Sequence, residues 1–179
     1  VPPELLGTHI GSGRDHTTGR WLDLDFRAGT ALWGHLGIEW DLSSADEAEL
    51  HRLRDWVALH KTHRDLLHAG VVVHADPTNP ALQLDGVVAR DGREALYKLS
   101  MLEHSLVWPP GRIVLPGLDP ATTYLVTIAS PRPLPDPMAP PWAREGVRLS
   151  GESLAAVGLQ APFLMVDTLA DIQAAAVDA

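Results

Sequence analysis

The chain has 179 residues, of which 14 are basic, 23 are acidic and none is cysteine, so its formal net charge is −9. This length predicts one domain, or one domain and part of another, and 45% hydrophobic residues are enough for a folded core. The acidic balance argues against nucleic-acid and membrane partners, no apolar run approaches the ~20 residues of a membrane span, and the lack of cysteine fits a cytoplasmic protein.

Residues 1–69 predict alternating strands and helices, an α/β pattern. Residues 2–10 favour a short strand after two prolines, and residues 11–20 form a polar, glycine-rich loop behind it. Apolar residues at helical spacing then predict a helix over residues 22–33. Residues 34–37 contain two glycines and are expected to break that helix.

A second strand and a long helix are expected next. Residues 38–42 alternate between apolar and polar, which predicts a strand. Ser44 and Glu47 have the spacing of a capping box, so the helix is expected to begin there and to end near residue 69, before Gly70. Its apolar stripe is expected to comprise Leu50, Leu53, Val57, Leu66 and Leu67.

Two successive βα units predict a parallel sheet. Two strands alone would not form a stable parallel sheet, because both faces of such sheets are normally covered. The chain also begins with Val1 rather than Met. We therefore expect further strands upstream of Val1, and we expect the isolated chain to aggregate or to be loosely packed over residues 1–69.

Residues 70–179 predict an all-β part. Asp91-Gly92 separates two β-type runs, which is typical of a hairpin, and the even spacing of short strands indicates a β-sandwich. One helical turn is expected within residues 150–158. The proline-rich stretch from Pro131 to Pro141 predicts an extended connection, with a ligand for a proline-recognising partner as the alternative. The expected strands lie near residues 71–75, 81–90, 94–102, 111–115, 122–129 and 163–169.

The nine histidines raise the question of a metal site. His60 and His63 are one helical turn apart and could share a face of the long helix. His51 lies further away, and no third ligand has a suitable spacing. We therefore expect these histidines to lie on the helix surface or to pack against it, and we predict no metal site.

Glu39 and Asp41 are two residues apart on a predicted strand, so their side chains are expected to point to the same side. Glycoside hydrolysis requires a pair of carboxyl groups, but acidic residues just before a helix are also stabilised by its dipole.

The polar loop of residues 11–20 follows a strand, where the sites of α/β proteins usually lie, yet it contains neither a phosphate-loop motif nor a Gly-x-Ser-x-Gly elbow.

The chain resembles glycoside hydrolase family 36, the bacterial α-galactosidases, in several ordered motifs that cover nearly its whole length. The first motifs are PPELLGTHI and DHTTGR, and a later one is LWGHLGIEWDL. The stretches that carry the resemblance are residues 2–10, 15–20, 26–28, 32–42, 56–61, 67–70, 109–112, 115–120, 149–151 and 158–159.

The resemblance implies an architecture and an activity. Residues 1–69 would be the last βα units of a (β/α)₈ TIM barrel, and residues 70–179 would be a C-terminal antiparallel β-sandwich. The family implies a retaining hydrolase of terminal α-galactosides such as melibiose and raffinose, without a metal or nucleotide cofactor and often in a homotetramer.

The family's catalytic motifs are absent from these 179 residues. Its nucleophile lies in a Lys-Trp-Asp-x-Asn-Arg motif and its acid/base Asp on another strand, and the Trp40-Asp41 pair fits neither position. We therefore assign no catalytic residue and expect the chain alone to hydrolyse nothing. His9 and His16 are the expected substrate-binding residues, because loops after barrel strands form the active-site face.

Two alternatives remain open at this stage. A non-catalytic carbohydrate-binding or assembly module could use the β-sandwich, with Trp108 or Trp142 stacked on a sugar unless both pack inside the fold. A different α-linked sugar, such as an N-acetylgalactosaminide, could also be the substrate.

Overall fold

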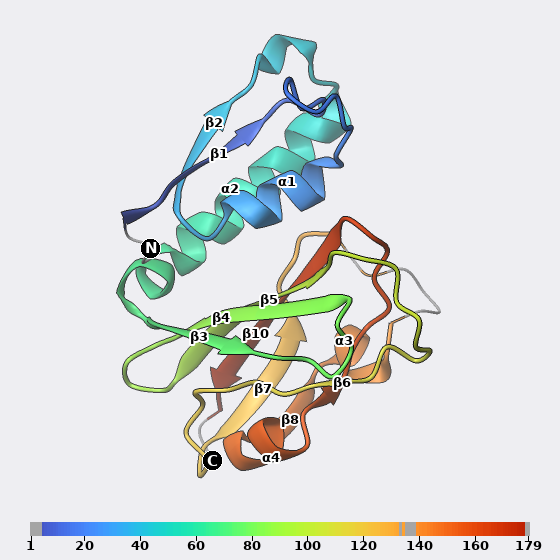
Figure 1. The fold of residues 1–179 in the computed structure, drawn as a ribbon. Helices are drawn as coiled ribbons and strands as arrows, with labels where there is room; N and C mark the ends of the chain where they lie inside the picture. Colours follow the sequence, from blue (N-terminus) through green and yellow to red (C-terminus); the bar gives the residue numbers. More distant parts are fainter. Residues whose placement is uncertain (1–4, 133, 135–138, 178–179) are drawn as a thin grey trace.

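The computed structural model describes residues 5–132, 134 and 139–177. Figure 1 shows an α/β part above a second part that is built on a large sheet. The α/β part contains β1 (Gly7–Gly11), α1 (Leu24–Ala31), β2 (His35–Glu39), the 3₁₀ helix η2 (Leu42–Ser44) and α2 (Glu47–Ala69). The second part contains β3 (Val71–Ala75), β4 (Leu82–Val88), β5 (Glu94–Met101), β6 (Arg112–Ile113), β7 (Thr123–Ile128), α3 (Pro141–Glu145), β8 (Val147–Ser150), α4 (Gly151–Ala156), β9 (Leu159–Gln160) and β10 (Thr168–Ala176).

The parallel pairing expected for the α/β part is confirmed. β1 and β2 pair in parallel, with Gly7 opposite His35 and Gly11 opposite Glu39. Both helices lie on the same side of these strands (Figure 1). Ile10 is fully buried and belongs to the core that the helices form, which identifies the helix-facing side of β1.

The predicted bounds of the second strand are wrong. β2 begins at His35 rather than at residue 38, and it ends before Asp41. The chain turns tightly at Gly34, where a Cβ atom would collide with the Leu6 carbonyl oxygen. This close approach lets the His35 N–H donate to that oxygen at 2.8 Å, so pairing with β1 starts directly after the turn.

The predicted start of the long helix is displaced by two residues. Asp46, not Ser44, is the N-cap of α2: its carboxylate accepts from the Glu49 N–H at 2.8 Å, and the Glu49 side chain accepts from the Asp46 N–H at 3.4 Å. Ser44 instead ends η2. The end of α2 at Ala69 is as predicted, and its buried side chains are Leu53, Trp56, His63, Leu66 and Leu67.

The second part is built on a six-stranded antiparallel sheet with the order β3-β4-β5-β10-β7-β8, and β6 and β9 form a separate antiparallel pair. The strands expected near residues 71–75, 81–90, 94–102 and 122–129 are confirmed. The Asp91-Gly92 hairpin between β4 and β5 is also confirmed, and Gly92 has a φ of 70° there.

The last predicted strand is wrong. Residues 163–167 contain no strand, and β10 covers Thr168–Ala176 between β5 and β7. β8 and β9 were not predicted, and the strand near residues 111–115 shortens to β6. The helical turn expected within residues 150–158 is confirmed as α4. Residues 133 and 135–138 of the Pro131–Pro141 stretch lie outside the described residues.

Both faces of the large sheet are covered. Alternate residues of β5 and β10, among them Tyr97 and Ile172, face a core that also contains Ile113 and Leu159 of the β6–β9 pair. Leu96 and Val87 face the opposite way and join the core of α1 and α2. The α/β part therefore packs on one face of the sheet. In the described residues, no helix has the length and apolar composition needed to cross a membrane.

Candidate functional site

The carboxyl ends of β1 and β2 lie at the same edge of the α/β part, because the strands are parallel. A hollow of about 390 Å³ extends along β1 from Gly7 to Gly11, between this strand, the loop that follows it and α1. Polar and glycine residues form much of its wall, and Phe26 and Leu22 add apolar surface. His9 and His16, the two residues predicted to bind substrate, both line it.

A contact between His9 and Glu39 joins the two strands. The His9 Nε2 lies 3.0 Å from Glu39 Oε2 at the end of β2. The sequence identified both residues as candidates but did not pair them, because their proximity depends on strand register. Asp41 takes no part: its side chain accepts from the Ser43 N–H at 3.0 Å and from the Ser43 hydroxyl at 2.7 Å, and these hydrogen bonds, the hydroxyl first, lower its pKa. The expectation that Glu39 and Asp41 share one side of a strand is therefore wrong.

The loop after β1 is organised by Asp15. Its Oδ1 accepts from the Thr18 N–H at 2.6 Å, from the Thr18 hydroxyl at 2.8 Å and from the Thr17 N–H at 3.0 Å. The hydrogen bond from the Thr18 N–H is the main reason that the pKa of this carboxyl is lowered. Asp15 therefore shapes the turn, and it leaves His16 exposed beside the hollow.

Arg27 supports the same loop from α1, and no sequence pattern identified it. Its guanidinium group donates to the Gly11 carbonyl oxygen and, at 3.1 Å, to the Leu22 carbonyl oxygen. The group also lies 5.1 Å from the centre of the Trp40 ring. Because its partners are backbone carbonyls and a ring from another loop, only the folded structure brings them together.

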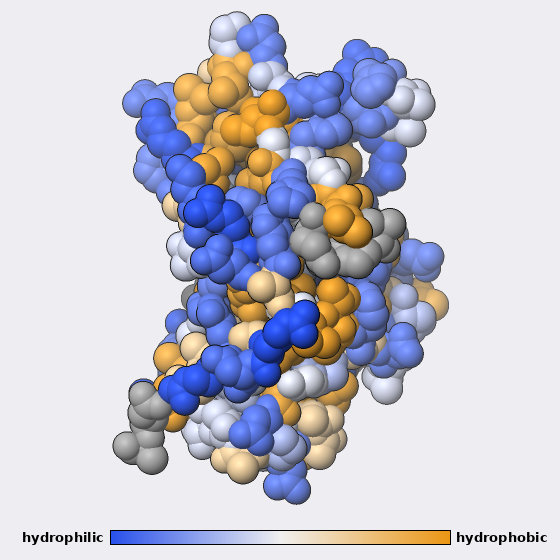
Figure 2. Space-filling view, turned by 90° about the vertical axis from the view of Figure 1, so that its left-hand side faces the viewer, coloured by the Kyte–Doolittle hydropathy of each residue, from blue (hydrophilic) through white to orange (hydrophobic). Residues whose placement is uncertain are grey.

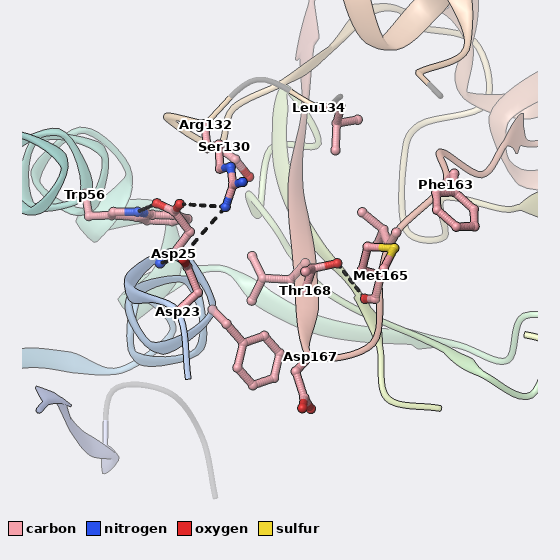
Figure 3. Close-up of a pocket in the computed structure, with 13 residues that line it drawn as sticks. Asp23, Asp25, Trp56, Ser130, Arg132, Leu134, Phe163, Met165, Asp167 and Thr168 are labelled. Atoms are coloured by element: carbon pink, nitrogen blue, oxygen red, sulfur yellow. Dashed lines mark hydrogen bonds and ion pairs between the residues drawn. The ribbon is translucent and has the colours of Figure 1, made fainter. Parts of the chain in front are cut away.

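A second hollow, of about 120 Å³, lies where the α/β part meets the large sheet (Figure 3). On one side Asp25 accepts from the Trp56 indole N–H at 2.8 Å and from Arg132 at 3.4 Å, and Arg52 lies 3.3 Å away. Figure 3 shows Phe163 and Met165 on the opposite side, with Thr168 between. The ion pair between Arg132 and Asp25 therefore links the second part to the α/β part at this junction.

Comparison with models of known protein families shows to which family the chain belongs. A family model described as Melibiase matches residues 1–70, and the model of the glycosyl hydrolase family 36 C-terminal domain matches residues 80–177. The chain belongs to glycoside hydrolase family 36.

Relatives of this family 36 chain are α-galactosidases. The chain is 34% identical to the Alpha-galactosidase of Escherichia coli over 171 residues, which are 91% of this chain and 24% of that protein. It is 30% identical to Alpha-galactosidase C of Emericella nidulans over 134 residues, which are 70% of this chain and 17% of that protein. The chain thus spans about a quarter or less of the length of these relatives.

Solved structures share the fold of the family 36 chain. An α-galactosidase from Lactobacillus brevis superposes with a TM-score of 0.81 at 22% identity, and the match covers 99% of this chain and 23% of that one. A family 36 α-galactosidase from Geobacillus stearothermophilus in complex with raffinose gives 0.81 at 23% identity, covering 98% of this chain and 22% of that one.

Two histidines of α2, His60 and His63, pack against neighbouring elements in this family 36 chain. His60 Nδ1 lies 3.2 Å from the Leu32 carbonyl oxygen, and burial lowers the pKa of His60. His63 is buried, with its Nδ1 3.1 Å from Glu94 Oε1 in β5. Within the described ranges, no group of three or more potential ligands could hold a metal ion.

The two tryptophans considered for sugar stacking differ in exposure. Trp142 is buried and its indole N–H donates to the Gln160 carbonyl oxygen at 2.9 Å, so it is a packing residue. Trp108 is 67% exposed and meets the Phe163 ring edge-on, with 4.9 Å between centroids. Of the two, only Trp108 offers a ring to a ligand.

Proposed function

We propose that this chain is the C-terminal portion of an α-galactosidase, a retaining glycoside hydrolase that cleaves terminal α-galactosides of the melibiose and raffinose type. The observation that carries the proposal is the 34% identity to the Escherichia coli Alpha-galactosidase along 91% of the chain. The solved relative from Geobacillus stearothermophilus, which holds raffinose, supports the same class of substrate.

In this proposal residues 1–69 are the last βα units of a TIM barrel and residues 70–179 are a C-terminal β-sandwich. The parallel β1-α1-β2-α2 order, with both helices on one side, is the repeating unit of such a barrel. Figure 2 shows apolar surface over the upper, α/β part of the molecule. The exposed large apolar residues of this part are Leu5, Leu6, Trp21, Ile38 and Leu42, and further barrel strands would cover such surface.

His9 and His16 are the residues of this chain that we propose to bind substrate, because they line the hollow along β1 and the loop that follows it. The nucleophile and the acid/base would come from earlier barrel strands, so the 179 residues alone would be inactive. A retaining enzyme needs two carboxyl groups about 5–5.5 Å apart, and Asp15 and Asp41 are committed to local turns. The complete enzyme would be a cytoplasmic homotetramer that needs no cofactor.

The product's configuration tests this proposal. The longer enzyme that contains these residues should release galactose initially as the α-anomer from p-nitrophenyl α-galactoside, as NMR during the first turnovers would detect. Initial β-anomer would exclude retention, and faster turnover of the matching α-N-acetylgalactosaminide would assign a different sugar.

His16→Ala should raise KM or lower kcat, whereas unchanged kinetics would assign His16 a structural role.

The exposed ring of Trp108 favours one alternative, a non-catalytic carbohydrate-binding module. It predicts that galactose or raffinose quenches the tryptophan fluorescence of the 179-residue chain, and that Trp108→Phe removes the quenching. The same fluorescence with and without sugar would contradict this alternative.

A further inference from the structure

His9 and Glu39 stand among glycines on the face of β1 and β2 that is turned away from the helices. Side chains alternate along a strand, and the register places His9 beside Gly37 and Gly11 beside Glu39, so these residues share one face. Within the described part of the chain, a Cβ on Gly7 or Gly11 would meet no heavy atom within 4 Å beyond its own neighbours. Within the described residues, no side chain fills the space around the pair.

The opposite face of the same strands serves a different purpose. Ile10 is fully buried there against α1 and α2, and the Thr8 hydroxyl donates to the Ala31 carbonyl oxygen at 2.6 Å. Packing thus uses one face of β1, whereas the face with His9 carries glycines and polar groups. In a βα barrel, substrates bind at the carboxyl ends of the strands, where the loops that follow them form the active-site face.

The contact between His9 and Glu39 joins two polar side chains, which are 60% and 76% exposed in this chain. Their 3.0 Å contact does decide the chemistry of the imidazole, because a carboxylate only accepts hydrogen bonds. When Nε2 carries the proton that Glu39 accepts, the neutral ring leaves Nδ1 as an acceptor.

We propose that Glu39 is a positioning residue that holds His9 in its Nε2–H form, so that Nδ1 accepts a hydrogen bond from a hydroxyl group of the galactoside. This inference rests on the proposed function for the identity of the sugar. It assigns Glu39 no contact with the reacting atoms and no proton transfer: Glu39 acts through His9.

The chain contains a matched control pair. His51 Nδ1 lies 3.2 Å from Asp55 Oδ2, one turn apart on α2, and both side chains are substantially exposed. This pair has the same chemistry as His9 and Glu39 but does not line the hollow along β1. Removing it should therefore leave substrate binding unchanged.

The tautomer of His9 tests the first step without any assay of activity. In the longer enzyme that contains these residues, at about pH 8, long-range ¹H–¹⁵N NMR should show the His9 ring in its Nε2–H form. Glu39→Ala should give a mixture of both tautomers, whereas Glu39→Gln, which keeps a carbonyl acceptor, should retain the Nε2–H form. An unchanged tautomer in Glu39→Ala would overturn the proposal.

A double-mutant cycle in the longer enzyme tests the second step. Glu39→Ala should raise KM for p-nitrophenyl α-galactoside about 3- to 10-fold, the effect of one hydrogen bond, with kcat nearly unchanged. Glu39→Gln should restore most of this loss. His9→Ala should raise KM at least as much, and adding Glu39→Ala to it should have no further effect. His51→Ala and Asp55→Ala should match the unmodified enzyme.

The outcomes separate this inference from the proposed function. Independent, multiplicative effects of His9→Ala and Glu39→Ala, or normal kinetics of Glu39→Ala, would overturn the role of Glu39 in an active enzyme. A longer enzyme that hydrolyses no α-galactoside would instead defeat the proposed function, and the NMR result would still decide whether Glu39 sets the tautomer of His9.

Discussion

Asp171 has the most unusual environment of any described carboxyl group. It is fully buried in β10, on the face of the sheet that is turned toward α1 and α2. Burial raises its pKa to about 7, against the opposing effects of a 3.0 Å hydrogen bond from the Ser130 hydroxyl and of the positive charge of Lys98. The sequence did not identify Asp171, because its burial depends on helices that pack across the sheet from more than a hundred residues away.

The raised pKa predicts how stability depends on pH. An unfolded aspartate ionises near 3.8 and the folded one near 7, so over this range the folded state holds the proton more tightly. The contribution of Asp171 to the free energy of unfolding must therefore fall as the pH rises from about 4 to 7. Asp171→Asn removes this contribution. Between pH 5 and pH 7.5, the free energy of unfolding of Asp171→Asn, measured in urea, should therefore rise by about 2–3 kcal/mol relative to that of the unmodified chain. A constant difference at both pH values would contradict the assignment.

At the scale of the elements, features that depend on one segment of the chain were predicted correctly. Features that depend on pairing between distant segments were not. The hairpin turn at Gly92 and the end of α2 at Ala69 depend on local chemistry, and both were predicted. β10 was misplaced because residues 170–176 are rich in alanine, a poor strand former, and the strand is stabilised by its two neighbours, β5 and β7. His9 and Glu39 come together only through the register of β1 and β2.

The cap of α2 gives a direct test at this scale. Asp46→Ala removes the carboxylate that accepts from the Glu49 N–H and should lower the free energy of unfolding by about 1 kcal/mol. Ser44→Ala, at the position that the sequence pattern favoured, removes only a hydrogen bond to the Asp41 carbonyl oxygen and should cost less. Urea unfolding of the two variants decides between the caps, and a larger loss for Ser44→Ala would contradict the structure.

At the scale of the whole molecule, the α/β part and the large sheet are joined by polar contacts around a shared apolar core. Arg20 in the loop after β1 lies 2.6 Å from Asp167, just before β10. His63 Nδ1 of α2 lies 3.1 Å from Glu94 Oε1 of β5 without forming a hydrogen bond, and Glu94 accepts from Gln173 of β10 at 3.0 Å. These contacts link segments far apart in the sequence, so no local pattern could reveal them. The chain passes from one part to the other at Gly70.

Gly70 should be sensitive to any added side chain. A Cβ there would lie 2.8 Å from the Val88 carbonyl oxygen and would collide with the Val87 side chain. Gly70→Ala should therefore force α2 away from β4 and lower the free energy of unfolding by about 1–3 kcal/mol. Gly7→Ala, which adds its methyl group to open space, is the control and should be nearly neutral. Equal stabilities of the two variants, measured by thermal unfolding, would show that the junction is loosely packed.

Turnover of an aryl α-galactoside, measured side by side for the 179-residue chain and for the longer polypeptide that ends in these residues, tests the central claim most directly. We expect the longer polypeptide to release p-nitrophenol from p-nitrophenyl α-galactoside and the 179-residue chain to release none, because the retaining pair of carboxyl groups would lie on earlier strands. Turnover by the 179-residue chain, or none by the longer polypeptide, would contradict the account.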